Sequence, residues 1–93
     1  MKSIIQTEKE CYKCKTTYCL EEHHIFGGSN RKISEKYGLK VYLCHYHHNE
    51  PPDGVHFNKE FMQKLHKLGQ KAYMKKYNKT IENFIKEFGK NYL

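Results

Sequence analysis

Four residues with soft side chains stand in two pairs of identical spacing. Two residues separate Cys11 from Cys14, and two separate Cys44 from His47. A tight turn with this spacing places two ligands on one side, as tetrahedral zinc requires. We therefore predict that a hairpin brings the four side chains together around a structural zinc ion with no open position. His48 could replace His47, because a three-residue gap after Cys44 is also compatible with zinc.

The cysteines have alternative roles. A thioredoxin-like redox pair has the spacing of Cys11 and Cys14, but it expects a βαβ context that this sequence does not offer. Cys19 falls outside the paired spacing. We expect it to be a small buried hydrophobe, with a reserve zinc ligand as the alternative.

A second group of candidate ligands consists of His23, His24 and His48, with His56 as a possible addition on a loop that folds back. A catalytic metal site must leave positions open for water and substrate. Neighbouring strand residues point to opposite faces, so only one of His23 and His24 should bind the metal unless the strand ends and twists between them. The other is then free to act as a general base, since histidine titrates near neutral pH.

The histidines at positions 47 and 48 are expected to lie on a short helix. Successive helical residues point about 100° apart, so His47 and His48 should serve two different sites. The preceding strand is expected at 39–43, and a first strand at 16–23. Pro51 and Pro52 end the short helix, because proline lacks a donor and restricts the residue before it.

Between the two strands we expect a loop. Gly27 and Gly28 are strong turn signals, and Ser34 could cap a single helical turn that stops at Gly38. The basic residues of this segment could bind phosphates, although a solvated loop is an equal alternative. They are Arg31, Lys32 and Lys36.

Two helices are expected after the loop. The first covers about 58–77, with an apolar stripe at Phe61, Leu65, Leu68 and Ala72. The second begins at Thr80, a possible cap. Its expected apolar face comprises Ile81, Phe84, Ile85, Phe88 and Tyr92. We expect both faces to form core, with a dimer interface as the alternative, and His66 to be an ordinary surface histidine.

The composition indicates one small basic domain. The 93 residues include 17 Lys and Arg against 10 Asp and Glu, eight Tyr and five Phe. A core of this size gives thin stability, so a structural metal would help. The positive charge and the aromatic residues suit a polyanion such as nucleic acid, although solvated lysines are the simpler alternative.

The sequence has no apolar run long enough to span a membrane and no signal-peptide pattern at its start. We therefore expect a reducing, cytoplasmic setting, in which cysteines bind metal more often than they form disulfides.

The motifs together resemble the HNH endonucleases of the ββα-metal superfamily, in particular small phage-borne members that carry zinc. The resemblance covers residues 11–48: a Cys11/Cys14 knuckle, His23-His24-Ile25, Leu43-Cys44 and His47-His48. The two helices predicted from their apolar spacing form a helical hairpin at 58–93 in the same single domain. The resemblance implies an α+β fold with a zinc-bearing ββα-metal finger at 11–57. It also implies that His23 and His48 bind a catalytic metal and that His24 is the general base. One departure is Leu39, where the family usually has an asparagine.

The function implied by this resemblance is metal-dependent hydrolysis of nucleic-acid phosphodiester bonds, with DNA as the expected partner. The expected cofactors are a structural Zn²⁺ and one catalytic divalent ion, Mg²⁺, Mn²⁺, Ni²⁺ or Zn²⁺. A homodimer or a phage or host protein partner is also possible. The alternatives are a zinc-stabilised nucleic-acid-binding module without catalysis, and a regulatory protein whose Phe84/Phe88 face binds a partner.

Overall fold

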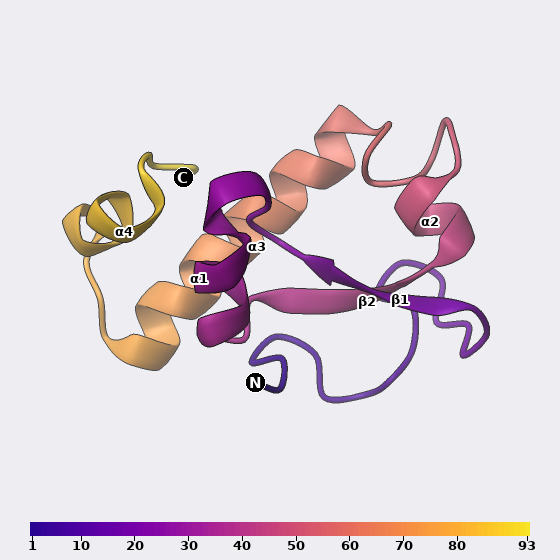
Figure 1. Ribbon diagram of the computed structural model, residues 1–93, viewed down its shortest axis with the longest axis horizontal. Helices are drawn as coiled ribbons and strands as arrows, with labels where there is room; N and C mark the ends of the chain where they lie inside the picture. Colours follow the sequence, from indigo (N-terminus) through magenta and orange to yellow (C-terminus); the bar gives the residue numbers. More distant parts are fainter.

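The computed structural model describes residues 1–93 and centres on a two-stranded antiparallel sheet (Figure 1). Strand β1 (Leu20–His24) pairs with β2 (Lys40–Cys44), with Leu20 opposite Cys44 and His24 opposite Lys40. The predicted α+β class is therefore confirmed. This register places the cysteine that ends β2 beside the start of β1, and it sets His23 opposite Val41.

The first strand is shorter than the sequence indicated. Residues 16–19 are not in the sheet, because the Cys11/Cys14 knuckle closes as a separate turn in which Cys11 N–H donates to the Thr16 carbonyl. Cys19 has a positive φ of 53°, a left-handed conformation that turns the chain into β1. The strand prediction was wrong for residues 16–19, because the knuckle turn occupies backbone groups that pairing between strands would require.

The segment between the strands is more helical than expected. A 3₁₀ turn, η1 (Gly28–Asn30), leads into helix α1 (Arg31–Lys36). The prediction that Ser34 caps a helical turn was wrong. Ser34 is buried inside α1, where its hydroxyl accepts from Phe26 N–H and donates to the Leu39 carbonyl. Gly38 ends the segment with a φ of 71°, in agreement with the expected left-handed stop.

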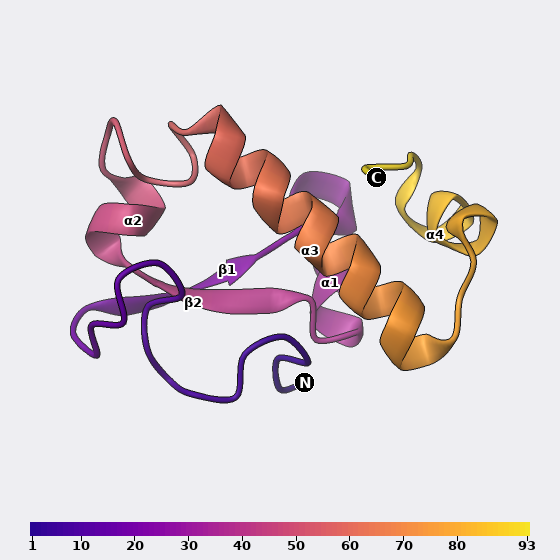
Figure 2. The same ribbon diagram turned by 180° about the vertical axis from the view of Figure 1, so that it is seen from behind.

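Helix α2 (His45–Asn49) begins where β2 ends, with Cys44 in an extended conformation at its N-cap. The N-terminal segment follows the other edge of β2 (Figure 2). Ile4 N–H donates to the Gly38 carbonyl and Tyr12 N–H to the Tyr42 carbonyl. The second contact satisfies a carbonyl of β2 that a two-stranded sheet would otherwise leave unpaired.

Helix α3 (Lys59–Tyr77) crosses the sheet diagonally, as both views show (Figures 1 and 2). Asn58 caps it by accepting from Phe61 N–H. The predicted stripe is shifted at its end, because Leu68 and Ala72 are half-buried while Gly69, Gln70 and Tyr73 are buried. A Cβ at Gly69 would lie 2.7 Å from an Ile25 side-chain carbon, so glycine permits the close approach of α3 to the end of β1.

Helix α4 (Ile81–Phe88) starts with a capping box between Thr80 and Asn83. It ends before Tyr92, so the predicted apolar face is only partly correct. Phe84 and Phe88 are buried, whereas Ile81 and Ile85 are more than a third exposed. The Phe84/Phe88 face is therefore occupied by the core and is not free for a partner.

The C-terminal helices share one core with the sheet. Phe26, which follows β1, lies 5.3 Å from Phe84 and 4.9 Å from Phe88 between ring centroids. Tyr73 of α3 packs against the same two rings. Aromatic side chains thus hold α3 and α4 to the end of β1, which fixes the position of His23 and His24. No helix combines the length and the apolar character required to cross a bilayer.

Candidate metal centres

Three thiols and one imidazole converge where the knuckle meets the end of β2. The Cys44 Sγ lies 3.3 Å from His47 Nδ1, the Cys11 Sγ lies 3.8 Å from the same nitrogen, and the Cys14 and Cys44 sulfurs are 3.9 Å apart. Ligands of a tetrahedral zinc ion are about 3.8 Å apart for two sulfurs and about 3.6 Å for sulfur and nitrogen. Cys11, Cys14, Cys44 and His47 therefore lie close enough to hold a metal ion, in a geometry compatible with structural zinc.

Burial and backbone hydrogen bonds act on the thiols of the cluster in opposite directions. Burial raises the pKa of Cys11, but hydrogen bonds from the backbone of Cys44, Cys14 and Lys13 oppose this and bring the pKa down to about 6. Burial raises the pKa of the Cys44 thiol. Cys19 is exposed and lies outside this cluster, so both roles predicted for it, buried hydrophobe and reserve ligand, were wrong.

The neighbouring imidazole of α2 points to a different cluster. Ring nitrogens of His23, His48 and His56 all lie within 4.8 Å of one another, close enough to hold a second metal ion. The Nε2 atoms of His48 and His56 are 3.1 Å apart, near the separation of about 3.4 Å expected for two imidazoles on one tetrahedral ion. The structure thus assigns His47 to the sulfur cluster and His48 to the histidine cluster.

A carboxylate fixes the orientation of His48. Glu21 Oε1 lies 2.7 Å from His48 Nδ1 and also accepts from the Asn49 side chain. Hydrogen bonds from His48 and His45 lower the pKa of Glu21, so the carboxylate is ionised and can only accept. His48 therefore carries its proton on Nδ1 and directs the Nε2 lone pair at the cluster, as metal-binding histidines usually do.

His23 is the most buried member, at 4% exposure. Its Nε2 is buried without any hydrogen-bond partner. Burial, together with the neighbouring histidines His48 and His56, lowers the pKa of His23 to about 3, so the ring is neutral at physiological pH. A buried neutral imidazole with an unsatisfied nitrogen is a group that a metal ion would complete.

His24 has different partners. Its Nε2 lies 2.7 Å from Glu35 Oε1, and its side chain is 8% exposed. Glu35 in turn contacts Lys40 Nζ at 3.0 Å, and Lys40 also pairs with Glu22 at 3.2 Å. Hydrogen bonds from His24, the terminal amine and Lys40 lower the pKa of Glu35 to about 2. The carboxylate can therefore only accept, so Nε2 of His24 donates to it and Nδ1 is the ring nitrogen left for another partner.

A cavity of about 390 Å³ connects these groups. Both members of the His23/His24 pair line it, together with His48, His56 and Arg31. Lys32 and Lys36 do not line it, although we had grouped them with Arg31. Leu39 is fully buried and presents no polar side-chain atom to the cavity.

Three residues of this region were not among the predicted site residues. Glu21 could have been recognised in the sequence, because it stands two residues before His23 and so shares one face of the strand with it. The position of Glu35 instead depends on the packing of α1 against β1. His66 is not an ordinary surface histidine. Its ring stacks on Phe26 with centroids 5.4 Å apart, and burial lowers its pKa.

Comparisons with protein-family models, with curated proteins and with solved structures find no significant match. The arrangement of these side chains therefore carries the functional argument. It combines a closed sulfur-rich cluster, an imidazole cluster beside a cavity, and a carboxylate-bound histidine that lines the same cavity.

Proposed function

We propose that this chain is a metal-dependent endonuclease of the HNH type, with DNA as its substrate. The observation that carries the proposal is the cavity in which the imidazoles of His23, His48 and His56 lie beside His24. An open cluster of ligands next to an oriented general base is the arrangement that hydrolysis of a phosphodiester requires.

In this proposal His24 accepts the proton of the attacking water at Nδ1. Glu35 holds the opposite nitrogen and keeps the lone pair on Nδ1. The water oxygen forms the new bond to phosphorus, and the bond to the 3′ oxygen breaks. Arg31, which lines the cavity, donates to the phosphate oxygens.

A divalent ion on His23, His48 and His56 would neutralise charge on the phosphate and on the departing 3′ oxygen. Three imidazoles favour Mn²⁺, Co²⁺, Ni²⁺ or Zn²⁺, because Mg²⁺ prefers oxygen ligands. Glu21 supports this ligand set by orienting His48. The Cys11/Cys14/Cys44/His47 cluster has a structural role in the proposal, as a zinc site that anchors the knuckle to the end of β2 and to α2.

The test is plasmid nicking by the zinc-loaded protein, with each divalent ion added in turn. We expect cleavage by the wild type and a loss of about 10²- to 10⁴-fold in His24→Ala. Tyr18→Ala is the control, because Tyr18 is 79% exposed and does not line the cavity. Equal cleavage by His24→Ala and the wild type would refute the assignment of His24.

A second candidate function is nucleic-acid binding without catalysis. It is favoured by Leu39, whose buried side chain stands where the resembling family usually has an asparagine. Binding of DNA with no cleavage in any divalent ion would support this candidate over the nuclease.

A further inference from the structure

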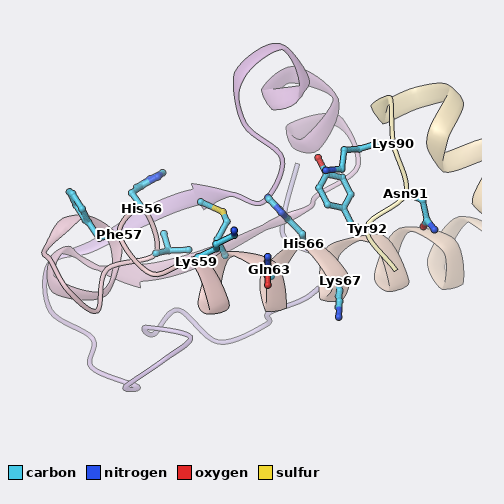
Figure 3. A pocket seen from close by; sticks show the side chains of 11 residues that line it. His56, Phe57, Lys59, Gln63, His66, Lys67, Lys90, Asn91 and Tyr92 are labelled. Atoms are coloured by element: carbon cyan, nitrogen blue, oxygen red, sulfur yellow. The ribbon is translucent and has the colours of Figure 1, made fainter.

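A groove of about 790 Å³ runs along the exposed face of α3 (Figure 3). Lys59, Gln63 and Lys67 stand at helical spacings of four residues along it, a length of about 12 Å. Phe57 and His56 lie at one end in the figure, and Lys90 and Tyr92 lie at the other. The groove is therefore a channel between the loop before α3 and the C-terminal tail.

The charge of the groove is entirely positive. Lys59, Lys67 and Lys90 line it, and none of its 11 lining residues is acidic. None of the three lysines forms an ion pair with a carboxylate. Three cationic groups without counter-ions along one channel suit a ligand with regularly spaced negative charges.

Aromatic rings accompany these charges. Phe57 is 58% exposed although it is large and apolar. At the other end, Tyr92 lies 4.6 Å from His66 between ring centroids, and His66 stacks in turn on Phe26. Tyr92 is thus packed against the core, whereas the exposed ring of Phe57 can stack on a nucleobase that is not already stacked in a duplex.

The wall formed by the C-terminal tail is firmly attached. Gln70 is fully buried on α3 and makes two hydrogen bonds to the tail. Its amide donates to Asn91 Oδ1 at 2.7 Å, and its carbonyl accepts from Tyr92 N–H at 2.7 Å. The positions of Lys90 and Tyr92 relative to α3 are thus fixed by the core.

The groove is continuous with the cavity that contains His24. His56, Met62 and His66 line both of them. A polymer lying along α3 would therefore pass directly into the cavity beside the histidine cluster.

We propose that this groove binds a single strand of nucleic acid with unpaired bases. The lysines contact phosphates along the strand, while the exposed ring of Phe57 stacks on a base. For the nuclease proposed above, on which this extension rests, the groove delivers the single-stranded part of a substrate to the cavity.

Binding is measured by fluorescence anisotropy with a labelled oligothymidylate, in the His24→Ala background so that the probe stays intact. The test variant is Lys59→Gln/Lys67→Gln. The control is Lys64→Gln/Lys71→Gln, which removes the same charge from exposed positions of the same helix outside the groove. We expect binding to weaken about tenfold in the test variant, and the slope of log K against log salt to fall by about 1.4. Equal losses in both variants would overturn the proposal, because they would indicate a response to net charge alone.

The role of stacking is tested with Phe57→Ala. We expect affinity for the oligothymidylate to fall at least about fivefold, with much less change for a blunt duplex of equal length. Thermal melting and zinc content establish that the variant is folded. Unchanged binding of the single strand in folded Phe57→Ala, or tighter binding of the duplex by the parent protein, would overturn the proposal.

The proposed binding groove and the proposed nuclease activity can be refuted separately. Binding of the oligothymidylate that depends on Lys59, Lys67 and Phe57, without cleavage in any metal, would refute the nuclease activity and support the groove. Cleavage that depends on His24 but is unchanged in Lys59→Gln/Lys67→Gln would refute the groove and support the nuclease activity.

Discussion

Two adjacent histidines of α2 belong to two different clusters, a closed one rich in sulfur and an open one beside a cavity. His47 lies among three sulfurs, two of which belong to the buried residues Cys11 and Cys44. His48 lies with His23 and His56 at the wall of a cavity. Because neighbouring helical residues point about 100° apart, one short helix can contribute to a closed cluster and to an open one.

The clusters also differ in how their ligands are held in place. Backbone hydrogen bonds act on the thiol of Cys11, whereas carboxylates orient the histidines near the cavity. Glu21 fixes the proton of His48, and Glu35 fixes that of His24. Tight turns can position thiols through their own backbone, but an oriented imidazole requires a side chain from elsewhere in the fold.

The largest expected effect concerns the sulfur cluster. We expect Cys14→Ser to abolish zinc binding and cooperative unfolding, because a structural zinc site contributes about 10 kcal/mol or more to a small domain. Zinc stoichiometry and circular dichroism during thermal melting measure both losses. The matched control is Cys19→Ser, which changes another exposed cysteine outside the cluster. If Cys14→Ser melted like Cys19→Ser, the cluster would not be a structural site.

The next effect separates the two clusters directly. We expect His48→Ala to keep the zinc of the sulfur cluster and to lose about 10²-fold or more of the cleavage rate, because it removes a ligand beside the cavity. His47→Ala should instead lose zinc and stability. Zinc content and plasmid nicking of the two variants test this division. The same profile in both would show that the helix serves one site.

A smaller effect is expected at the carboxylate that holds His24. Glu35→Gln should reduce kcat about 100-fold with little change in KM, because glutamine can also donate to Nε2 and so permits the unproductive tautomer. Nitrogen NMR of the imidazole reports that tautomer change, which a purely structural role would not produce. Glu60→Gln is the control, since Glu60 is an exposed carboxylate that neither contacts His24 nor lines the cavity. An unchanged tautomer in Glu35→Gln would exclude the positioning role.

Much of the candidate site follows from local spacing. The pairs Cys11/Cys14 and Cys44/His47 each lie within one turn, so the sequence predicts them well and the structure confirms that they meet. The division of labour between His47 and His48 follows from helical geometry. Glu35 could not be predicted, because its contact with His24 depends on α1, a helix whose start at Arg31 was not expected.

The fold was predictable where periodicity is strong and less so where tertiary contacts compete. The 19-residue helix α3 agrees with its expected range, because its apolar spacing is long and regular. The end of α4 was placed too late because Gly89 takes a φ of 98° and turns Tyr92 back onto Gln70. Tyr92 thus joins the core from a tail, which helical periodicity alone cannot distinguish from a continued helix.

The smallest expected effect is a dependence of stability on pH that arises from His23. Burial lowers the pKa of His23 to about 3, whereas an unfolded histidine titrates at about 6.5. Between these values the folded chain binds fewer protons than the unfolded chain, so the free energy of unfolding falls as pH falls through this window. From pH 7 to pH 5.5 the loss is about 1 kcal/mol. Urea unfolding of the wild type and of His23→Gln at both pH values measures it, because effects of the thiols and other histidines are common to both proteins. We expect the wild type to lose about 1 kcal/mol more than the variant, and equal losses would mean that His23 is not held in its neutral form.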